Sequence, residues 1–322
     1  MVKTRRLGRT GLEVSPLCLG TMTFGAATSK REAFSIMDAA VERGITFFDT
    51  ADMYSHWVEG NSGGESETVI GQWLKKQDRR RVTIATKVRA RMWDGPNGDG
   101  LSRAHIIQAV EDSLRRLQTD YIDLYQTHWF DENTPIEETL SALDALVQAG
   151  KVRYIGASNY PAWRLTKALW ASDVHNLVRY ESLQPHYSLL HRKEVERELA
   201  DLCLDQQIGV IPYSPLAAGF LTGKYTRESR EQDRQADNRG TVQELIEQDA
   251  AYDVLDVVQE VATAHDAPMT QVALAWLLSK PFITAPIVGV RTMAHLEGAV
   301  GAMEIELTDE ALERLDTASV GF

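Results

Sequence analysis

The chain has 322 residues, of which 43% are hydrophobic and 25% charged, a composition typical of a globular protein with a large buried core. The formal net charge of -12 argues against binding to nucleic acid or to an anionic membrane, because both need a basic surface. The N-terminus lacks the apolar core of a signal peptide, and no apolar run approaches the roughly 20 residues of a membrane helix, so we expect a cytoplasmic protein.

Short β-type apolar runs alternate along the chain with amphipathic segments. The opening segment 4–15 contains a glycine-rich turn and predicts a small β-hairpin. Eight strands are then expected, at 15–20, 45–49, 82–87, 121–128, 152–158, 182–187, 208–213 and 283–289.

Residues typical of helix ends lie between these strands. Gly44 and Gly150 stand where a left-handed C-terminal cap is wanted, and Ser102 is placed as an N-cap. Thr134 and Pro135 are expected as the N-cap and first residue of the helix that stops at Gly150. The other helices are expected near 31–43, 65–76, 102–117, 161–172, 192–206, 251–265, 269–279 and 308–318.

The alternation of strand and helix, repeated eight times, predicts an α/β fold with a parallel sheet covered by helices. An open doubly wound sheet also produces this order, but eight units of similar length favour a closed (β/α)8 TIM barrel, with the hairpin plugging its base. We expect a single domain over residues 1–322 with long βα loops. The polar segment 225–250 is expected as one such loop, either a flap or a solvated connection.

Four polar residues with complementary chemistry follow three successive strands. Asp49 ends the second strand, Tyr54 lies in the loop after it, Lys87 ends the third and His128 the fourth. Singly, each is more often a cap, a packing residue or a solvated charge. Because the βα loops of a barrel meet at its C-terminal mouth, we expect the four to converge on one catalytic site.

Proton transfer is the chemistry that this group suits. A free tyrosine ionises near pH 10, and a nearby ammonium lowers that pKa by about 1–3 units. Lys87 is expected to act on Tyr54 in this way, with Asp49 as its counter-charge. His128 is expected to orient a substrate oxygen. Tyr54 would then be the general acid for a carbonyl oxygen that gains negative charge when the carbon receives hydride.

The motifs DTADMYS, ATK, LYQTH, GASNY, SLQPHYSLL and PYSPLAAGFLTGKY occur in that order along the chain. Together they resemble the aldo-keto reductase superfamily, most closely its bacterial and potassium-channel β-subunit-like branch. The resemblance runs from RRLGRTGLEVSPLCLGTMTFG to PIVGVRTMAHLEGAV. It implies that Asp49, Tyr54, Lys87 and His128 are the catalytic tetrad of an NAD(P)H-dependent oxidoreductase, with Tyr54 as the proton donor.

The resemblance also implies a cofactor site. Ser158, Asn159 and Gln184 match residues that hold the nicotinamide carboxamide, and Tyr213 matches the ring that stacks on the nicotinamide. The remaining implied contacts, from the pyrophosphate loop to the adenosine 2′-phosphate, are Thr21, Met22, Ser214, Pro215, Leu216, Gly219, Lys224, Gly289, Arg291, Thr292 and His295.

Two positions depart from the family pattern near the adenine. The family often has an acid and an amide where this chain has Gly298 and Ala299, which leaves the adenine contacts open. Arg291 stands where the family grips the adenosine 2′-phosphate, so NADPH is expected over NADH.

The expected reaction is reduction of a small-molecule aldehyde or ketone to an alcohol. Two alternatives stay open: oxidation of an alcohol or sugar in the reverse direction, and a non-catalytic nicotinamide-binding interaction subunit. Trp57, Trp93 and Trp129 follow strands two, three and four, so they either wall a substrate pocket or pack their loops. The loop 89–100 is expected to shape the mouth. The substrate and the oligomeric state are left open.

Motifs of other enzyme classes fail in detail. GASNY lacks the closing glycine of a serine-hydrolase elbow, and GFLTGKY has the wrong spacing for a P-loop. No G-x-G-x-x-G follows a strand, and the eight histidines show no metal-binding spacing, so no metal is expected. Cys18 and Cys203 lie far apart in apolar surroundings and are expected as free core thiols.

Overall fold

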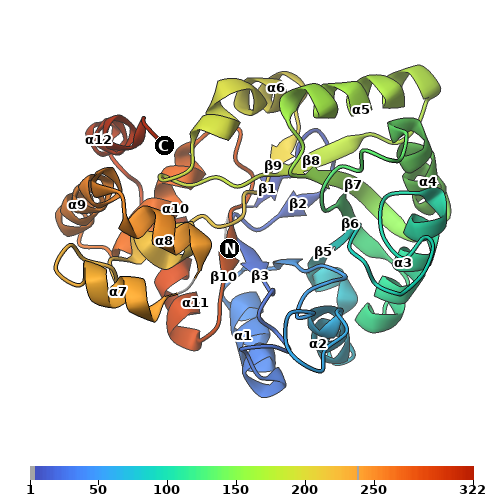
Figure 1. The fold of residues 1–322 in the computed structure, drawn as a ribbon, viewed down its shortest axis with the longest axis horizontal. Coiled ribbons are helices and arrows are strands. Elements are labelled where there is room, and N and C mark those ends of the chain that lie inside the picture. Colours follow the sequence, from blue (N-terminus) through green and yellow to red (C-terminus); the bar gives the residue numbers. More distant parts are fainter. Residues whose placement is uncertain (1–3, 238) are drawn as a thin grey trace.

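The strands of the computed structural model, which describes residues 4–237 and 239–322, form one parallel sheet of eight strands in the order β10-β3-β4-β5-β6-β7-β8-β9. Helices surround this sheet (Figure 1). Its strands are β3 (Cys18–Gly20), β4 (Phe47–Asp49), β5 (Thr83–Val88), β6 (Ile122–Thr127), β7 (Val152–Ser158), β8 (Tyr180–Gln184), β9 (Gly209–Val210) and β10 (Ile287–Gly289).

Hydrogen bonds from β10 and from the segment before it join the two edges of this sheet. The Thr284 amide donates to the Val210 carbonyl at 2.7 Å, and the Ile287 amide donates to the Pro212 carbonyl at 2.8 Å. Val210 also forms a parallel bridge with Ile283. The strands therefore close on themselves, which confirms the predicted (β/α)8 barrel.

Most strands differ in extent from their predicted ranges, and four of them begin or end near a proline. Pro16 precedes β3, Pro185 follows β8 directly, Pro212 lies shortly after β9, and Pro286 precedes β10. Proline lacks the amide hydrogen that a sheet ladder needs, so regular pairing begins after it or ends before it.

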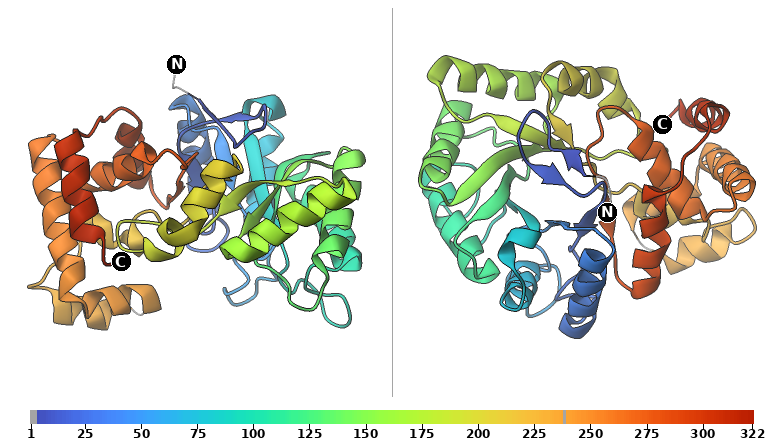
Figure 2. Two further views of the ribbon diagram at one scale, coloured as in Figure 1. Left: turned by 90° about the horizontal axis from the view of Figure 1, so that it is seen from above. Right: turned by 180° about the vertical axis from the view of Figure 1, so that it is seen from behind.

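The predicted N-terminal hairpin is confirmed. β1 (Arg5–Arg6) and β2 (Glu13–Val14) pair antiparallel, and Figure 2 shows them at one end of the barrel. Leu7 of this hairpin is fully buried and clusters with Cys18, Phe47 and Leu124 of the barrel interior. The hairpin therefore closes the base of the barrel, as expected.

The helices lie outside the sheet. They are α1 (Lys30–Glu42), α2 (Glu65–Leu74), α3 (Arg103–Leu117), α4 (Ile136–Gln148), α5 (Ala162–His175), α6 (Ala200–Asp205), α7 (Arg230–Ala236), α8 (Gly240–Ile246), α9 (Asp249–Ala264), α10 (Met269–Ser279), α11 (Met293–Val300) and α12 (Asp309–Ser319). A π-helical turn (Val195–Leu199) precedes α6, and short 3-10 turns occupy Arg79–Arg81, Ala217–Thr222 and Gly301–Met303. No helix in the described parts of the chain is both long and apolar enough to cross a membrane.

Several predicted helix ends are confirmed, and one is wrong. Ser102 accepts a hydrogen bond from the His105 amide, and Gly44 and Gly150 have φ values of 83° and 73°. At α4, however, the N-cap is Pro135 and not the preceding threonine. The Thr134 hydroxyl instead donates to the Asp131 carboxylate of the turn before it.

The segment 225–250 is not the loop that its polarity predicted. It contains α7 and α8, and only Asn238 within it lies outside the described residues. Arg239 binds the Ala218 carbonyl at 2.8 Å and the Tyr225 phenol at 2.8 Å, which ties α8 to the loop after β9. These tertiary contacts stabilise helices whose sequence alone is weakly amphipathic.

Alternation along each strand separates the inner and outer faces of the barrel. Phe47 points inward to the hairpin cluster, whereas Phe48 points outward and lies 5.5 Å from the ring of Trp73 on α2. The next inward residue after Phe47 is Asp49, because successive side chains of a strand point to opposite faces. The apolar interior is therefore followed at the C-terminal mouth by polar side chains.

Candidate active site

A layer of polar side chains crosses the C-terminal end of the barrel. It consists of the last inward-facing residues of five neighbouring strands: Asp49, Lys87, Gln126, Ser158 and Gln184. All five are buried. Parallel strands bring their C-terminal ends to one edge of the barrel, so residues distant in sequence meet here.

The Lys87 ammonium lies at the centre of this layer. Its Nζ donates to Asp49 Oδ1 at 2.5 Å, to the Thr50 carbonyl at 2.8 Å and to Tyr54 Oη at 2.8 Å. An ammonium has three N–H donors, so all of them are used. The Tyr54 oxygen therefore accepts a hydrogen bond from Lys87, and its own proton is directed elsewhere.

The second oxygen of Asp49 is also satisfied. Asp49 Oδ2 accepts from Gln126 Nε2 at 3.1 Å and from Gln184 Nε2 at 2.9 Å. A buried ion pair is tolerated only when its remaining hydrogen-bonding capacity is met, and the two amides meet it here. Sequence reasoning did not single out Gln126, although it lies two residues before His128 and so shares its face of the strand.

The charges in this layer shift two pKa values. Burial alone would lower the pKa of Lys87, but the Asp49 carboxylate and the Tyr54 oxygen outweigh it, so the pKa lies above its ordinary value. Burial raises the pKa of Tyr54, and Lys87 acts against it with a smaller effect. Lys87 thus acts in the expected direction, but the predicted net lowering of the Tyr54 pKa is wrong for this structure, because burial opposes the phenolate more strongly.

His128 follows β6 and faces Tyr54 across the mouth. The two rings lie 6.1 Å apart between centroids, and Trp129 stacks on the imidazole at 3.9 Å. Burial, with added repulsion from Lys87 and Arg89, lowers the pKa of His128 to about 2, so the ring is neutral at physiological pH. Nδ1 has no hydrogen-bond partner among the described residues, and we assign the ring proton to Nε2, since an unpaired buried acceptor costs less than an unpaired donor.

Asn159 connects the histidine to the opposite side of the mouth. Its Nδ2 donates to the His128 carbonyl at 3.0 Å and to Ser158 Oγ at 3.1 Å, and its Oδ1 accepts from Tyr213 Oη at 3.0 Å. Asn159 adopts a φ of 60°, a left-handed conformation that asparagine tolerates better than most residues. The amide predicted to hold a carboxamide is thus already engaged, and it positions its neighbours.

One face of the Tyr213 ring is covered by a stack of two histidines. His186 stacks behind it at 5.1 Å, and His191 stacks behind His186 at 3.8 Å. Gln184 uses its amide nitrogen on Asp49 and Gln126, which leaves its carbonyl oxygen to accept from a ligand amide. Sequence reasoning missed His186, whose position two residues after Gln184 was the available signal.

The loop after β9 has a strained backbone. Ser214, Ala217, Ala218 and Gly219 have φ values of 53°, 49°, 55° and 93°, and three of the four are not glycine. Such left-handed residues turn backbone N–H groups toward one side and often form anion-binding concavities. Pro215 and Leu216 complete this predicted pyrophosphate loop.

Cations gather beside this loop. Burial lowers the pKa of Lys224, and the charges of Arg239 and Arg291 lower it further. Burial also lowers the pKa of His295, with added effects from Arg291 and Lys224. Thr292 caps α11 at the same place by accepting from the His295 amide. Arg239 is paired with Asp237, but Lys224, Arg291 and His295 lie close enough to affect one another near the N-terminus of α11, an arrangement that fits a bound phosphate group. Sequence reasoning missed Arg239.

Some of the remaining predicted residues are exposed at the mouth, and others pack against their own loop or strand. Met22 is 51% exposed and Trp57 50% exposed, and Trp57 lies 6.3 Å from the Tyr54 ring, at the mouth. Trp93 instead packs on His105 of α3 at 4.8 Å, within the 89–100 loop. Thr21 is buried and donates to the Asp49 carbonyl, and Gly289 is the exposed last residue of β10.

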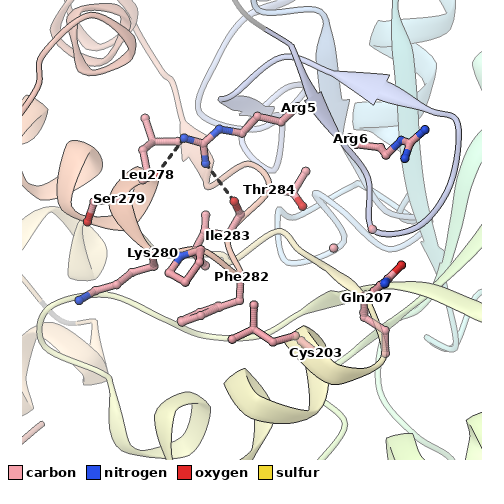
Figure 3. A pocket seen from close by; sticks show the side chains of 15 residues that line it. Arg5, Arg6, Cys203, Gln207, Leu278, Ser279, Lys280, Phe282, Ile283 and Thr284 are labelled. Atoms are coloured by element: carbon pink, nitrogen blue, oxygen red, sulfur yellow. Dashed lines mark hydrogen bonds between the residues drawn. The ribbon is translucent and has the colours of Figure 1, made fainter.

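A pocket of about 530 Å³ lies at the hairpin end, away from these residues (Figure 3). Arg5 crosses it and donates to the Leu278 and Ile283 carbonyls at 2.8 and 2.9 Å, which satisfies the C-terminal end of α10. Arg5 therefore has a structural role, and the active sites of such barrels lie at the other end, where the strands end. Among the described residues, no three His, Cys, Asp or Glu side chains gather closely enough to hold a metal ion.

Comparison with known proteins identifies the class. Residues 16–320 match the Aldo/keto reductase family, and the chain belongs to that family. It is 42% identical to the uncharacterized oxidoreductase YrpG of Bacillus subtilis, over 96% of this chain and 94% of that protein. It is 35% identical to versiconal hemiacetal acetate reductase of Aspergillus parasiticus (97% and 95%) and 34% identical to protein tas of Escherichia coli (97% and 96%).

These findings confirm the resemblance that the sequence motifs indicated, including its bacterial character. The chain is an oxidoreductase of the nicotinamide-dependent, carbonyl-directed kind.

Proposed function

We propose that the protein reduces an aldehyde or ketone to an alcohol with NADPH, and that Tyr54 is the general acid. The observation that carries this proposal is the hydrogen bond from Lys87 Nζ to Tyr54 Oη. Because the phenol oxygen accepts from a lysine whose other donors are engaged, its own proton remains available to a substrate oxygen in the mouth.

The residues divide the work on the carbonyl between them. When bound, the reduced nicotinamide supplies a hydride to the carbonyl carbon. Tyr54 donates its proton to the oxygen that becomes negative, and the neutral imidazole of His128 holds that oxygen through Nε2–H, as a neutral histidine does at other carbonyls. Lys87 stabilises the phenolate that remains, and Asp49 keeps the charge of Lys87 compensated.

Contacts along the mouth support NADPH as the cofactor. The free face of Tyr213 would stack on the nicotinamide, and the Gln184 carbonyl oxygen would accept from its carboxamide. The strained loop 214–219 would hold the pyrophosphate. Arg291 and Lys224 at the start of α11 would hold the 2′-phosphate, the group that distinguishes NADPH from NADH.

The walls of the mouth favour an apolar carbonyl compound. Trp57 and Trp129 are each more than a third exposed and lie beside the Tyr54 and His128 rings, and the exposed Met22 follows β3 at the same end of the barrel. Flat apolar groups gain most from burial against such side chains.

The test is turnover by the purified protein with NADPH and a panel of aliphatic and aromatic aldehydes and ketones, followed by the absorbance of the reduced cofactor. We expect oxidation of NADPH that depends on the carbonyl compound. Tight cofactor binding without turnover of any carbonyl would contradict reduction and would favour a nicotinamide-binding interaction subunit.

A further inference from the structure

Helix α5 carries an apolar stripe on its outer face that the proposed function does not use. Trp163, Trp170 and Val174 are 60%, 59% and 52% exposed, and Lys167 lies between them on the same face. At about 100° per residue, these four positions fall within about 60° of one another around the helix. Figure 1 shows α5 on the periphery of the molecule, where its opposite face packs inward.

Two exposed tryptophans on one helix face need an explanation. Trp57 and Trp129 are also exposed, but they adjoin Tyr54 and His128 at the mouth. Trp163 and Trp170 have no such role. The Arg164 guanidinium lies 4.5 Å from the Trp163 ring, and even so most of that indole remains exposed. Contiguous apolar surface of this kind typically marks an interaction site.

The arrangement of the stripe is self-complementary. Its midpoint falls between Ala168 and Leu169, so a second α5 packed antiparallel across it would place Trp163 against Val174 of the second copy. The same register places Lys167 over Trp170 of the second copy, a cation–π contact. We propose that this face forms a two-fold symmetric dimer of the protein, with α5 packed antiparallel on its counterpart.

A second copy of this chain meets no opposing charge at the stripe. The net charge of -12 disfavours association of two copies through acidic surface. The stripe itself contains one cation and no carboxylate, and the symmetric register pairs that cation with an aromatic face instead of another cation. An isologous contact requires this kind of self-complementarity.

The area of the stripe sets how strongly the proposed dimer should associate. Two tryptophans exposed to about three-fifths offer roughly 300 Å² per protomer, against about 800 Å² per partner in a standard interface. Flanking residues must supply the rest, so the dimer should be reversible and should dissociate on dilution.

Cysteine cross-linking tests the register directly. Positions 163 and 174 lie about 16 Å apart along one helix, too far for a disulfide within a protomer. A mixture of Trp163→Cys protein and Val174→Cys protein should therefore form a disulfide-linked dimer under mild oxidation, and neither protein alone should. The native Cys18 and Cys203 are buried and do not compete. A mixture that stays monomeric, or single variants that link equally well, would overturn the proposal.

Sedimentation velocity over a wide range of protein concentration gives an independent test. The wild type should shift toward a dimer as concentration rises, and the Trp163→Ala/Trp170→Ala double variant should remain monomeric with an unchanged thermal melt. Leu204→Ala is the matched control, because Leu204 is 47% exposed on α6, and it should dimerise like the wild type. A monomeric wild type, an assembly that survives the double substitution, or one that Leu204→Ala also abolishes would each contradict this interface.

Discussion

Lys87 donates a hydrogen bond to the Tyr54 phenol at 2.8 Å while its other two N–H groups bind Asp49 and the Thr50 carbonyl. This contact fixes the direction in which the Tyr54 phenol donates and accepts hydrogen bonds. The phenol oxygen is an acceptor toward the protein, so the phenol can act only as a donor toward the mouth. The burial of the group, and not the lysine alone, sets how firmly the proton is held.

The ionisation of Tyr54 follows from this balance. Because burial raises the pKa of Tyr54 above its ordinary value, the phenol of the cofactor-free protein should stay protonated below about pH 10. Subtracting the ultraviolet titration of Tyr54→Phe from that of the wild type isolates this phenol. Lys87→Met should move its ionisation to still higher pH. Phenolate absorbance that appears below pH 9 in the difference spectrum would contradict the dominant effect of burial.

The ion pair beneath Tyr54 should be important for stability. Lys87→Met leaves the buried Asp49 carboxylate without its partner and should lower the free energy of unfolding by about 3–5 kcal/mol. Asp49→Asn combined with Lys87→Met removes both charges and should recover part of that loss. Urea unfolding of the three variants measures the difference. Equal stability of the single and double variants would show that the charge of Asp49 is not stranded by the lysine substitution.

His128 should make the protein less stable in acid. Its pKa is about 2 in the folded chain and about 6.5 when unfolded, so below pH 6.5 the unfolded chain takes up a proton that the folded chain refuses. The stabilisation is complete above pH 6.5 and declines toward the folded pKa, by roughly 2 kcal/mol at pH 5. His128→Phe should lose less stability than the wild type between pH 7 and pH 5 in urea unfolding. Parallel losses would place the folded pKa of His128 near its ordinary value.

Arg291 should determine the choice of cofactor. Arg291→Ala removes a cation from the cluster at the start of α11 and should weaken NADPH binding roughly tenfold, with little effect on NADH. Fluorescence titration with both cofactors measures the change. Arg9→Ala, an exposed arginine that pairs with Glu181 away from the mouth, is the control and should bind both cofactors as the wild type does. An equal loss for NADPH and NADH would remove Arg291 from recognition of the 2′-phosphate.

Much of this site could be predicted because barrel geometry converts strand ends into neighbours. Asp49, Lys87 and His128 lie at or directly next to the C-terminal ends of successive strands, so knowing the fold is enough to place them together. Gln126 was predictable on the same grounds, since it alternates with His128 on one face of β6. The prolines that shorten β8 and β10 were also visible in the sequence.

Other features depend on contacts that no local pattern records. The direction of the Tyr54 pKa shift depends on how completely the surrounding loops bury the phenol. Helices α7 and α8 depend on the contacts of Arg239 with Tyr225 and the Ala218 carbonyl, between segments that carry little helical signal. The hydrogen bond from Tyr213 to Asn159 likewise joins two segments, after β7 and after β9, that are far apart in sequence.

The central claim is that Tyr54 delivers the proton, and Tyr54→Phe tests it most directly. The substitution removes one oxygen while it keeps the ring, so cofactor binding should be retained. The measurement is steady-state kinetics with a carbonyl compound that the wild type reduces, paired with NADPH titration of the same preparation. We predict a fall in kcat of at least about a hundredfold, the usual contribution of a general acid, with nearly unchanged NADPH affinity. A kcat close to that of the wild type would contradict the role of Tyr54 as the acid.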